Sequence, residues 1–311
     1  MSKTITEKEI FNASEQELTV LMEKARKVSW NALGKRIRFY YPSKEFPSIS
    51  ITGSTCAQSC LYCNKHYLKA MHSLTTPQKM LNFALKLKAK GGKGMLISGG
   101  YDEESVVPID SYLDTISQIK KKTNLSINIH PGLVTLEQAK AIYDAGVDAA
   151  SFDLVTDNQV IREVIRNGKT AVDYKKSFEA LINAKLKVIP HICLGLYYGT
   201  DKGNIEAVKL ALNYDIPLIV FLGFIPTKGT PMEKVKVITS DFLTKISIYT
   251  RFRKTDLEQS LGCMRVRLPE YEREALLVGI NRIAVPKKKT IEFAQKTLGL
   301  NVESVQTCCA I

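Results

Sequence analysis

Short runs of apolar and β-branched residues alternate along this chain with longer segments whose apolar positions recur at helical spacing. The short runs have the length of buried strands, and the longer segments have that of amphipathic helices. Strands and helices in alternation are typical of a parallel sheet covered by helices. The predicted strands are Ser48–Gly53, Gly94–Ser98, Ser126–His130, Ala149–Asp153, Lys187–Ile192, Leu218–Phe224, Ser260–Met264 and Arg282–Val285. The predicted helices are Pro77–Lys90, Asp110–Lys122, Leu136–Ala145, Tyr174–Lys185, Gly203–Asn213, Thr239–Lys254, Pro269–Val278 and Lys287–Leu298.

Eight strand–helix units suggest a closed barrel, which typically needs roughly 250 residues. We therefore predict an α/β fold, a parallel (β/α)8 TIM-type barrel, over residues 46–299. Residues 1–45 are predicted as a helical extension that packs against the barrel, because Leu18, Leu21 and Met22 recur at helical spacing. Residues 300–311 form a C-terminal tail that carries cysteines. The whole chain, 1–311, is predicted as a single domain.

Composition bounds the class of protein. The chain has 311 residues with 45% hydrophobic content, enough for a full core, which excludes a disordered chain. It has no apolar run near the ~20 residues of a membrane helix, and its first residues lack the apolar segment of a secretory signal. We expect a cytoplasmic protein that does not enter a membrane. Seven cysteines are too sparse for a disulfide framework, so they are interpreted as thiols or metal ligands.

Three cysteines, Cys56, Cys60 and Cys63, form a C-x3-C-x2-C pattern directly after the first predicted strand. A structural zinc site is normally closed by four ligands, and here only His66 or His72 could supply the fourth nearby. Three unrelated buried cysteines are a further alternative, although cysteine is a rare residue. Three thiolates with one open position favour a four-iron four-sulfur cluster whose fourth iron is left for a cofactor.

This loop, with Tyr62 just before its last cysteine, resembles the cluster motif of the radical S-adenosylmethionine superfamily. The resemblance implies that Cys56, Cys60 and Cys63 hold the 4Fe-4S cluster and that S-adenosylmethionine binds its open iron. Reductive cleavage of that cofactor then yields a 5′-deoxyadenosyl radical, which removes hydrogen from an unactivated carbon. The barrel would orient the cofactor and exclude water.

Further segments resemble the cofactor-binding parts of the same superfamily. Ser98, Gly99 and Gly100 match the glycine-rich segment that meets the methionyl amino group, although Tyr101 follows where an acidic residue is often found. The resemblance also implies that Tyr62 lies in the cofactor-binding site, that Asp153 reaches the ribose or methionyl part and that Gly195 lies near adenine. Each glycine taken alone is equally consistent with an ordinary turn at the end of a strand.

The four remaining cysteines suggest a second cluster. Cys263 ends the seventh predicted strand, and Cys308 and Cys309 form a vicinal pair that could fold back over the barrel mouth. We predict that these three hold an auxiliary iron–sulfur cluster. The alternatives are a buried Cys263 and an exposed, redox-active pair. Cys193 is predicted to lie in the core.

The segment FLGFIPTKGTPME, which follows Val220, resembles biotin synthase and its relatives. Two departures matter: the predicted strands Gly94–Ser98 and Ser126–His130 lack the auxiliary cysteines of biotin synthase, and the N-terminal cysteine motif of bacterial lipoyl synthase is missing. The whole chain most resembles the biotin-synthase-like group that includes subunits of the archaeal-type two-component lipoyl synthase.

That resemblance implies a radical sulfurtransferase of lipoate biosynthesis. The substrate would be an octanoyl chain on a lipoyl carrier protein, and an electron donor would be needed. A related radical enzyme could act as partner subunit, and the sequence leaves open whether one is required. Three alternatives remain open: a biotin synthase-like enzyme, a radical methyltransferase or mutase, and a tRNA-modifying radical enzyme.

The charge is compatible with several partners. Lys and Arg total 44 against 31 for Asp and Glu, a net charge of +13, which would attract nucleic acid, an anionic lipid surface or an acidic protein. No basic module with interleaved aromatic residues is visible, which disfavours nucleic acid. We expect Arg265, Arg267 and Lys287–Lys289 to form a basic rim for an acidic carrier, although lysine-rich surfaces are also common in thermophiles. His130 and His191 are expected to face the active site.

Overall fold

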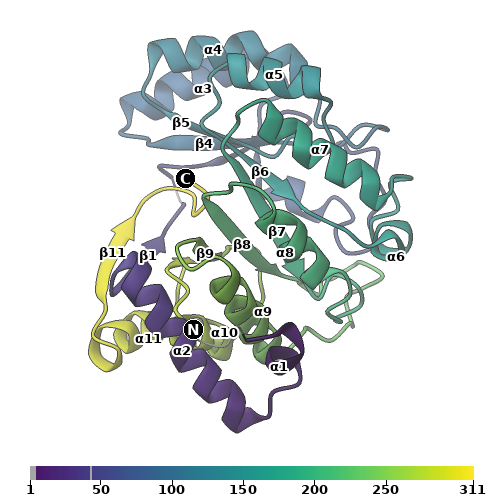
Figure 1. Ribbon diagram of the computed structural model, residues 1–311. Coiled ribbons are helices and arrows are strands. Elements are labelled where there is room, and N and C mark those ends of the chain that lie inside the picture. Colours follow the sequence, from purple (N-terminus) through teal and green to yellow (C-terminus); the bar gives the residue numbers. More distant parts are fainter. Residues whose placement is uncertain (1–4, 43) are drawn as a thin grey trace.

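One curled parallel sheet organises the molecule, as the computed structural model of residues 5–42 and 44–311 shows (Figure 1). Its eleven strands lie in the order β11-β1-β10-β9-β8-β7-β6-β5-β4-β2-β3, and every pairing between them is parallel. The strands are β1 (Arg36–Tyr40), β2 (Ser48–Ser50), β3 (His72–Ser73), β4 (Gly94–Ser98), β5 (Ser126–Ile129), β6 (Ala149–Asp153), β7 (Val188–Leu194), β8 (Leu218–Gly223), β9 (Glu258–Leu261), β10 (Arg282–Ala284) and β11 (Asn301–Val305).

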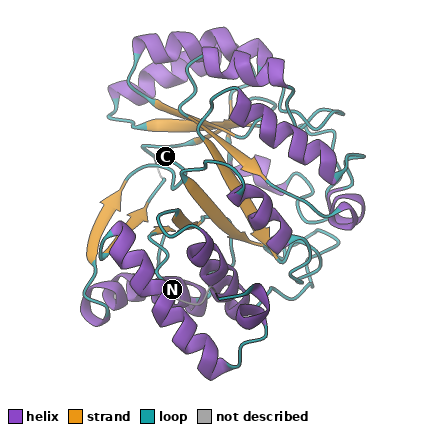
Figure 2. Ribbon diagram, viewed as in Figure 1, coloured by secondary structure: helices purple, strands orange, loops and turns teal. Residues whose placement is uncertain are grey.

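Helices cover the outside of the sheet (Figure 2). The α-helices are α1 (Glu7–Phe11), α2 (Glu15–Leu33), α3 (Pro77–Ala89), α4 (Leu113–Lys122), α5 (Leu136–Asp144), α6 (Asn158–Val160), α7 (Ala171–Asn183), α8 (Asn204–Leu212), α9 (Ser240–Arg253), α10 (Pro269–Val278) and α11 (Lys288–Glu292). Short 3-10 or π-helical turns are η1 (His66–Ala70), η2 (Asp110–Tyr112), η3 (Ile161–Ile165) and η4 (Phe293–Thr297). Among the described residues, no helix combines the length and apolar character that a membrane crossing requires.

The predicted fold class is confirmed, with three additional strands. The eight predicted strands correspond to β2 and β4–β10, in the predicted order around the sheet. The N-terminal segment adds β1, the C-terminal segment adds β11, and β3 lies beside β2. No pairing within the described ranges joins β3 to β11, so the sheet curls into a partial barrel with two edges.

The N-terminal extension is helical only as far as Leu33. Helix α2 begins at a capping box of Ser14 and Glu17, and Gly34, with φ of 83°, ends it. The next residues alternate in β1: Arg36 is exposed, whereas Ile37 and Phe39 are fully buried. That two-residue period suits a strand packed on one face, so the predicted helical extension consists of two helices followed by a strand that the prediction did not include.

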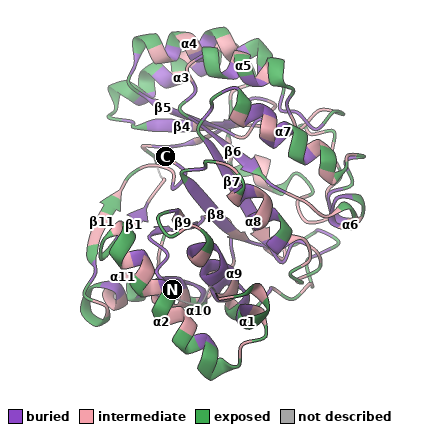
Figure 3. Ribbon diagram, in the orientation of Figure 1, coloured by how far each residue is buried: buried purple, intermediate pink, exposed green. Residues whose placement is uncertain are grey.

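The tail enters the interior of the curled sheet, where the C label lies in Figure 1. Ala310 is fully buried among Ala149, Ile189, Leu218 and Val220, which come from the first halves of β6, β7 and β8. Figure 3 shows these strands as mostly buried. The active-site face of such a barrel is at the carboxyl ends of its strands, so the expectation that the tail covers the mouth was wrong.

Candidate active site

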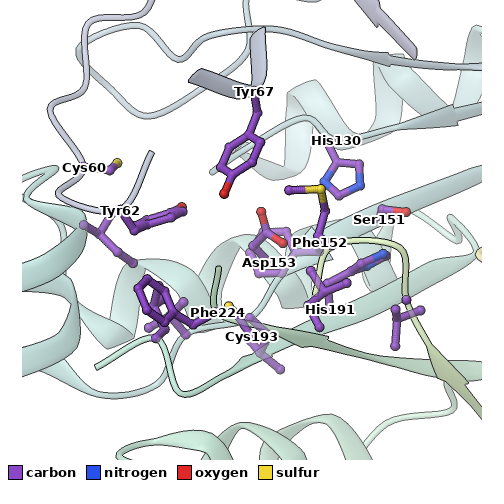
Figure 4. Close-up of a pocket in the computed structure, with 18 of the residues that line it drawn as sticks. Cys60, Tyr62, Tyr67, His130, Ser151, Phe152, Asp153, His191, Cys193 and Phe224 are labelled. Atoms are coloured by element: carbon purple, nitrogen blue, oxygen red, sulfur yellow. The ribbon is translucent and has the colours of Figure 1, made fainter. Parts of the chain in front are cut away.

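A cavity of about 470 Å³ lies inside the curled sheet, and its walls are mostly apolar and aromatic (Figure 4). Residues at or near the carboxyl ends of the strands line it, among them Ser98 of β4, Asp153 of β6 and Cys193 of β7. Its volume falls in the range of small-molecule sites, roughly 300–1,000 Å³. This is the position at which barrel enzymes carry their active sites.

The loop that carries the three cysteines docks on the end of β4. The N–H of Gly100 donates to Thr52 Oγ1 at 2.7 Å, and the same hydroxyl donates to the carbonyl of Thr55 at 2.9 Å. A side chain at position 100 would not fit, because a Cβ there would lie 2.0 Å from the Thr55 oxygen and 2.5 Å from the Cys56 Cβ. Gly100 therefore allows the loop to approach the strand closely.

Backbone N–H groups point at two of the loop sulfurs. The N–H of Tyr101 donates to Cys56 Sγ at 3.3 Å. Asn64 and Lys65 have φ angles of 43° and 60°, and the turn that they form directs the N–H groups of Lys65 and Tyr67 at the Cys63 sulfur. Consecutive N–H groups in such a turn make an anion-binding concavity, which suits a thiolate.

The thiols need a positive partner to ionise together. Burial and the neighbouring charges of Cys63 and Cys56 raise the pKa of Cys60 to about 12, and burial also raises that of Cys63. Iron in a cluster would supply the missing charge, because a coordinating thiol is deprotonated by its metal. Among the described residues, no three His, Cys, Asp or Glu side chains are close enough to share a single metal ion. The soft donors and their N–H partners are thus the features that fit a cluster.

Two of the other predicted cofactor residues face the cavity beside Cys60. Tyr62 and Asp153 point into it in Figure 4, and Ser98 also lines it. Enclosure raises the pKa of the Asp153 carboxyl, an effect that the nearby His191 opposes. Enclosure also keeps Tyr62 protonated by raising its pKa well above the ordinary value. Tyr62, Asp153 and Ser98 thus line one cavity with Cys60, and their contact with a bound cofactor stays a prediction.

The predicted glycines support the walls instead of lining them. Gly99 packs against Thr52, where an added Cβ would meet the hydroxyl at 3.0 Å. Gly195 has φ of 78°, and its N–H donates to Asn204 Oδ1 at 3.3 Å in the turn after β7. An added Cβ at position 195 would lie 3.1 Å from Ile238. A direct contact of Gly195 with adenine stays a prediction.

The second group of cysteines reaches the same cavity. Cys263, Cys308 and Cys309 all line it, and Cys263 and Cys309 pack with Tyr40 and Ala284. A hydrogen bond from Cys309 lowers the pKa of Cys308, whereas burial raises the pKa of Cys263 to about 11. All three cysteines of the predicted set thus line one cavity, and their binding of an auxiliary cluster stays a prediction.

Cys193 has two roles in the packing. It contacts the apolar core, as predicted, and it also lines the cavity (Figure 4). Burial raises the pKa of its thiol to about 12, so alone it is a neutral, small apolar group.

The histidines face the cavity, as expected. The rings of His130 and His191 have centroids 5.1 Å apart, and burial lowers the pKa of each imidazole to about 4. The carbonyl of Ile189 lies 2.9 Å from His191 Nδ1 and fixes that nitrogen as the donor. The His191 Nε2 is then a hydrogen-bond acceptor. Two neutral imidazoles are thus among the polar groups of the cavity wall.

The lining residues that the sequence reasoning missed include Tyr67, Ser151 and Phe224. Phe224 directly follows β8, so its place at the end of a strand could have identified it. Ser151 shares its strand face with Asp153, two residues on. Tyr67 lies in η1, and its hydroxyl contacts Thr227 Oγ1 at 2.7 Å. No local signal indicates that long-range contact.

The predicted basic rim is only partly present. Arg265 is fully buried and pairs with Glu272 at 2.6 Å, so its inclusion in the rim was wrong. Arg267 donates to the carbonyls of Ala284 and Cys263, each at 3.0 Å. Lys287 is the N-cap of α11 and Lys288 and Lys289 begin the helix, and all three are exposed.

Comparisons with known proteins agree with this site. The model of the Radical SAM superfamily matches residues 50–226, more than half of the chain. Biotin synthase of Clostridioides difficile is 25% identical and covers 91% of this chain and 90% of its own length. Biotin synthase of Parabacteroides distasonis is 23% identical over 93% of this chain and 88% of its own.

Solved structures show the same fold. Methylornithine synthase superposes over 97% of this chain and 95% of its own, with a TM-score of 0.68 and 15% identity. The FeFe-hydrogenase maturase of Carboxydothermus hydrogenoformans covers 88% of this chain and 65% of its own, with a TM-score of 0.69 and 19% identity. The family match begins at the last residue of β2 and covers the cysteine loop and strands β4–β8. The chain therefore belongs to the radical SAM superfamily and is a radical SAM enzyme.

Proposed function

We propose that this enzyme is a sulfurtransferase of lipoate biosynthesis, which inserts sulfur at an unactivated carbon of an octanoyl chain on an acidic lipoyl carrier protein. One observation carries the proposal: the cysteine loop and the second group, Cys263, Cys308 and Cys309, line the same cavity. A sulfur source held there would lie within reach of a carbon from which the radical has removed hydrogen.

The residues divide between the two tasks. Cys56, Cys60 and Cys63 would hold the four-iron four-sulfur cluster, which supplies the electron for reductive cleavage of S-adenosylmethionine. Cys263, Cys308 and Cys309 would hold an auxiliary iron–sulfur cluster as the sulfur source. Asp153 and Ser98 would position the cofactor between them.

The cavity walls suit an aliphatic substrate. Leu196, Phe224 and Leu222 offer apolar surface to a chain of methylene groups, and its burial is favourable by about 0.8 kcal/mol per CH₂. Tyr62 and Tyr101 enclose the space beside Cys60 and keep water away from a reactive carbon. His130 and His191 stay neutral, so they place no charge next to an apolar chain.

A biotin synthase-like activity is the second candidate. Its support is the similarity to biotin synthases over about nine-tenths of the chain, at 23–25% identity. Both candidates predict a sulfur source, whereas a methyltransferase or mutase needs none. The substrate therefore separates the two candidates, and the iron content separates both from the other classes.

Mass spectrometry of an octanoylated carrier peptide after anaerobic turnover tests the proposal. We expect the mass increment of sulfur on an octanoyl chain of unchanged length, in the presence of a related radical enzyme as partner subunit if the enzyme alone does not suffice. A biotin precursor, as acted on by a biotin synthase, serves as the competing substrate. Sulfur in that precursor but not in the peptide would overturn the lipoate assignment.

Two variants separate the cysteine groups. Cys60→Ala should abolish formation of 5′-deoxyadenosine, because it removes a ligand of the first cluster. Cys308→Ala should keep that cleavage but lose sulfur transfer, and its iron content should fall from about eight to about four per chain. Equal loss of cleavage in both variants would contradict the division.

A further inference from the structure

The placement of the vicinal cysteines raises a structural question. Strand β11 pairs with β1 as far as Val305, where the N–H of Tyr41 donates to the Val305 carbonyl at 2.8 Å. Within the next few residues the chain turns away from the sheet edge and enters the interior. Cys309 is there only 3% exposed. Something must hold this segment against the inner face of the sheet.

Arg282 of β10 makes the polar contacts that do so. Its Nη1 donates to the carbonyl of Cys309 at 3.0 Å and to the carbonyl of Ile311 at 2.7 Å. Its Nη2 contacts Glu258, which holds the guanidinium in place, and its Cζ lies 5.4 Å from the centroid of the Tyr40 ring. The guanidinium is planar and its N–H donors have a fixed geometry. One side chain can therefore donate hydrogen bonds to two backbone oxygens and a carboxylate at once.

The remaining contacts of the segment are weaker. Asn128 Nδ2 lies 3.7 Å from Cys308 Sγ, and the N–H of Ile311 donates to the Cys308 carbonyl at 3.1 Å, which closes a turn within the segment. Ala310 and Cys308 pack against apolar side chains of β6–β8. Apolar packing alone is not directional, so it does not determine which sulfur faces the cavity.

We infer that Arg282 is a positioning residue that holds residues 309–311 inside the barrel and so places Cys308 and Cys309 on the cavity wall. The consequence for sulfur transfer rests on the proposed function: without Arg282 the two thiols are no longer beside Cys263, and the second cluster loses its ligands. The first cluster loop is on other strands and keeps its geometry.

Alkylation kinetics of the iron-free full chain test this placement directly. Iodoacetamide labelling is followed on the tryptic peptide that begins at Thr297 and contains Cys308 and Cys309, and fragmentation distinguishes the two. In Arg282→Gln we expect Cys309 to react at least tenfold faster than in the wild type. The peptide Val188–Lys202, which carries Cys193, is the internal reference and should react at an unchanged rate.

Arg38→Gln is the matched control. Arg38 contacts the other oxygen of Glu258, and its remaining hydrogen bond goes to Tyr40, not to residues 309–311. Labelling of Cys309 should therefore stay at the wild-type rate. An equal rise in Arg38→Gln would mean that the Glu258 pair, not the grip on the tail, protects the thiol, and would overturn the inference.

Arg282→Lys keeps the positive charge but lacks the forked N–H donors of the guanidinium. If Arg282→Gln destabilises the whole chain, so that Cys193 also reacts faster, the Arg282→Lys variant provides the test. At least a threefold rise in the labelling rate of Cys309 alone supports the inference, and an unchanged rate refutes it. After reconstitution, Arg282→Gln should retain about four irons and form 5′-deoxyadenosine as the wild type does. A wild type with only about four irons would defeat the proposed function, whereas the labelling result would still test Arg282.

Discussion

Single residues in the cavity wall set its electrostatic character. Burial shifts the pKa values of His130, His191, Cys193 and Tyr62 in the directions that favour their neutral forms. Burial also raises the pKa of the Asp153 carboxyl, and the nearby His191 opposes this shift. A radical on carbon is protected in such surroundings, because few charged or ionised groups draw water into the site.

The histidine His130 should make folding stability depend on pH. Its pKa is about 4 in the folded protein against an ordinary value of 6.5. Between these values the unfolded chain binds more protons, so stability rises with pH across this window and falls on acidification. Protonation of His130 should lower the free energy of unfolding by roughly 2–3 kcal/mol between pH 6.5 and 4. In His130→Gln the fall in the free energy of unfolding over this range should be smaller by about that amount, as measured by urea unfolding of the iron-free chain.

The exposed His72 provides the control for this measurement. His72→Gln replaces an exposed surface side chain and should change the free energy of unfolding by less than about 0.5 kcal/mol at either pH. The same curve for His130→Gln and the wild type would show that His130 does not carry the effect.

At the scale of elements, the close approach of the cysteine loop to β4 depends on Gly100. A methyl group at that position would meet backbone and Cys56 atoms, not the end of a flexible side chain. Gly100→Ala should therefore displace the loop and lower 5′-deoxyadenosine formation at least tenfold, with a matching loss of iron. The cleavage product is measured by liquid chromatography after anaerobic reconstitution.

Gly223→Ala tests whether any added methyl near the cavity has this effect. A Cβ at position 223 would lie 3.4 Å from the Arg265 Cβ, an ordinary contact. This variant should keep its iron and its cleavage activity. Loss of cleavage in Gly223→Ala but not in Gly100→Ala would contradict the role given to the β4 turn.

A buried ion pair joins the loop after β9 to α10, and the same carboxylate contacts the start of α11. Glu272 accepts from Arg265 at 2.6 Å and from the N–H of Lys287 at 2.8 Å, and it also contacts Thr290 Oγ1. Glu272→Gln would leave the buried Arg265 charge unpaired, which typically costs about 3–5 kcal/mol. We expect a loss of that size in the free energy of unfolding from urea titration. Glu270→Gln, at an exposed site on the same helix, should change it by less than about 0.5 kcal/mol.

The sequence predicted the interior of the sheet better than its edges. Runs such as Leu218–Phe224 are apolar on both faces, and such a run predicts a buried strand from the sequence alone. Strand β11, with the sequence NVESV, is half-exposed and polar, and it exists only because β1 pairs with it. The inward turn of Cys309 depends on Arg282, 27 residues earlier, and no local pattern encodes it.

For the whole molecule, the two cysteine groups face one cavity from different parts of the sheet. The loop at Cys60 follows the end of β2, whereas Cys308 packs near the first halves of β6–β8. A substrate between them must enter at the mouth, where the flanking loops are. The net charge of +13 then acts on whatever carries the substrate to that mouth.

The positive net charge should attract an acidic carrier protein electrostatically before the two proteins touch. Opposite net charges speed diffusional encounter, and salt screens them with a Debye length of about 8 Å at 0.15 M. If the proposed carrier is the substrate, kcat/KM should fall about tenfold between 0.05 and 0.5 M NaCl, mostly through KM. A short octanoyl-lysine peptide without net charge should show less than a twofold change, which separates screening from salt damage to the enzyme.

Charge reversal at Lys288 and Lys289, both exposed at the start of α11, should reduce the salt dependence for the carrier alone. Equal salt dependence of kcat/KM for the carrier and the peptide would mean that the net charge does not steer the carrier toward the enzyme.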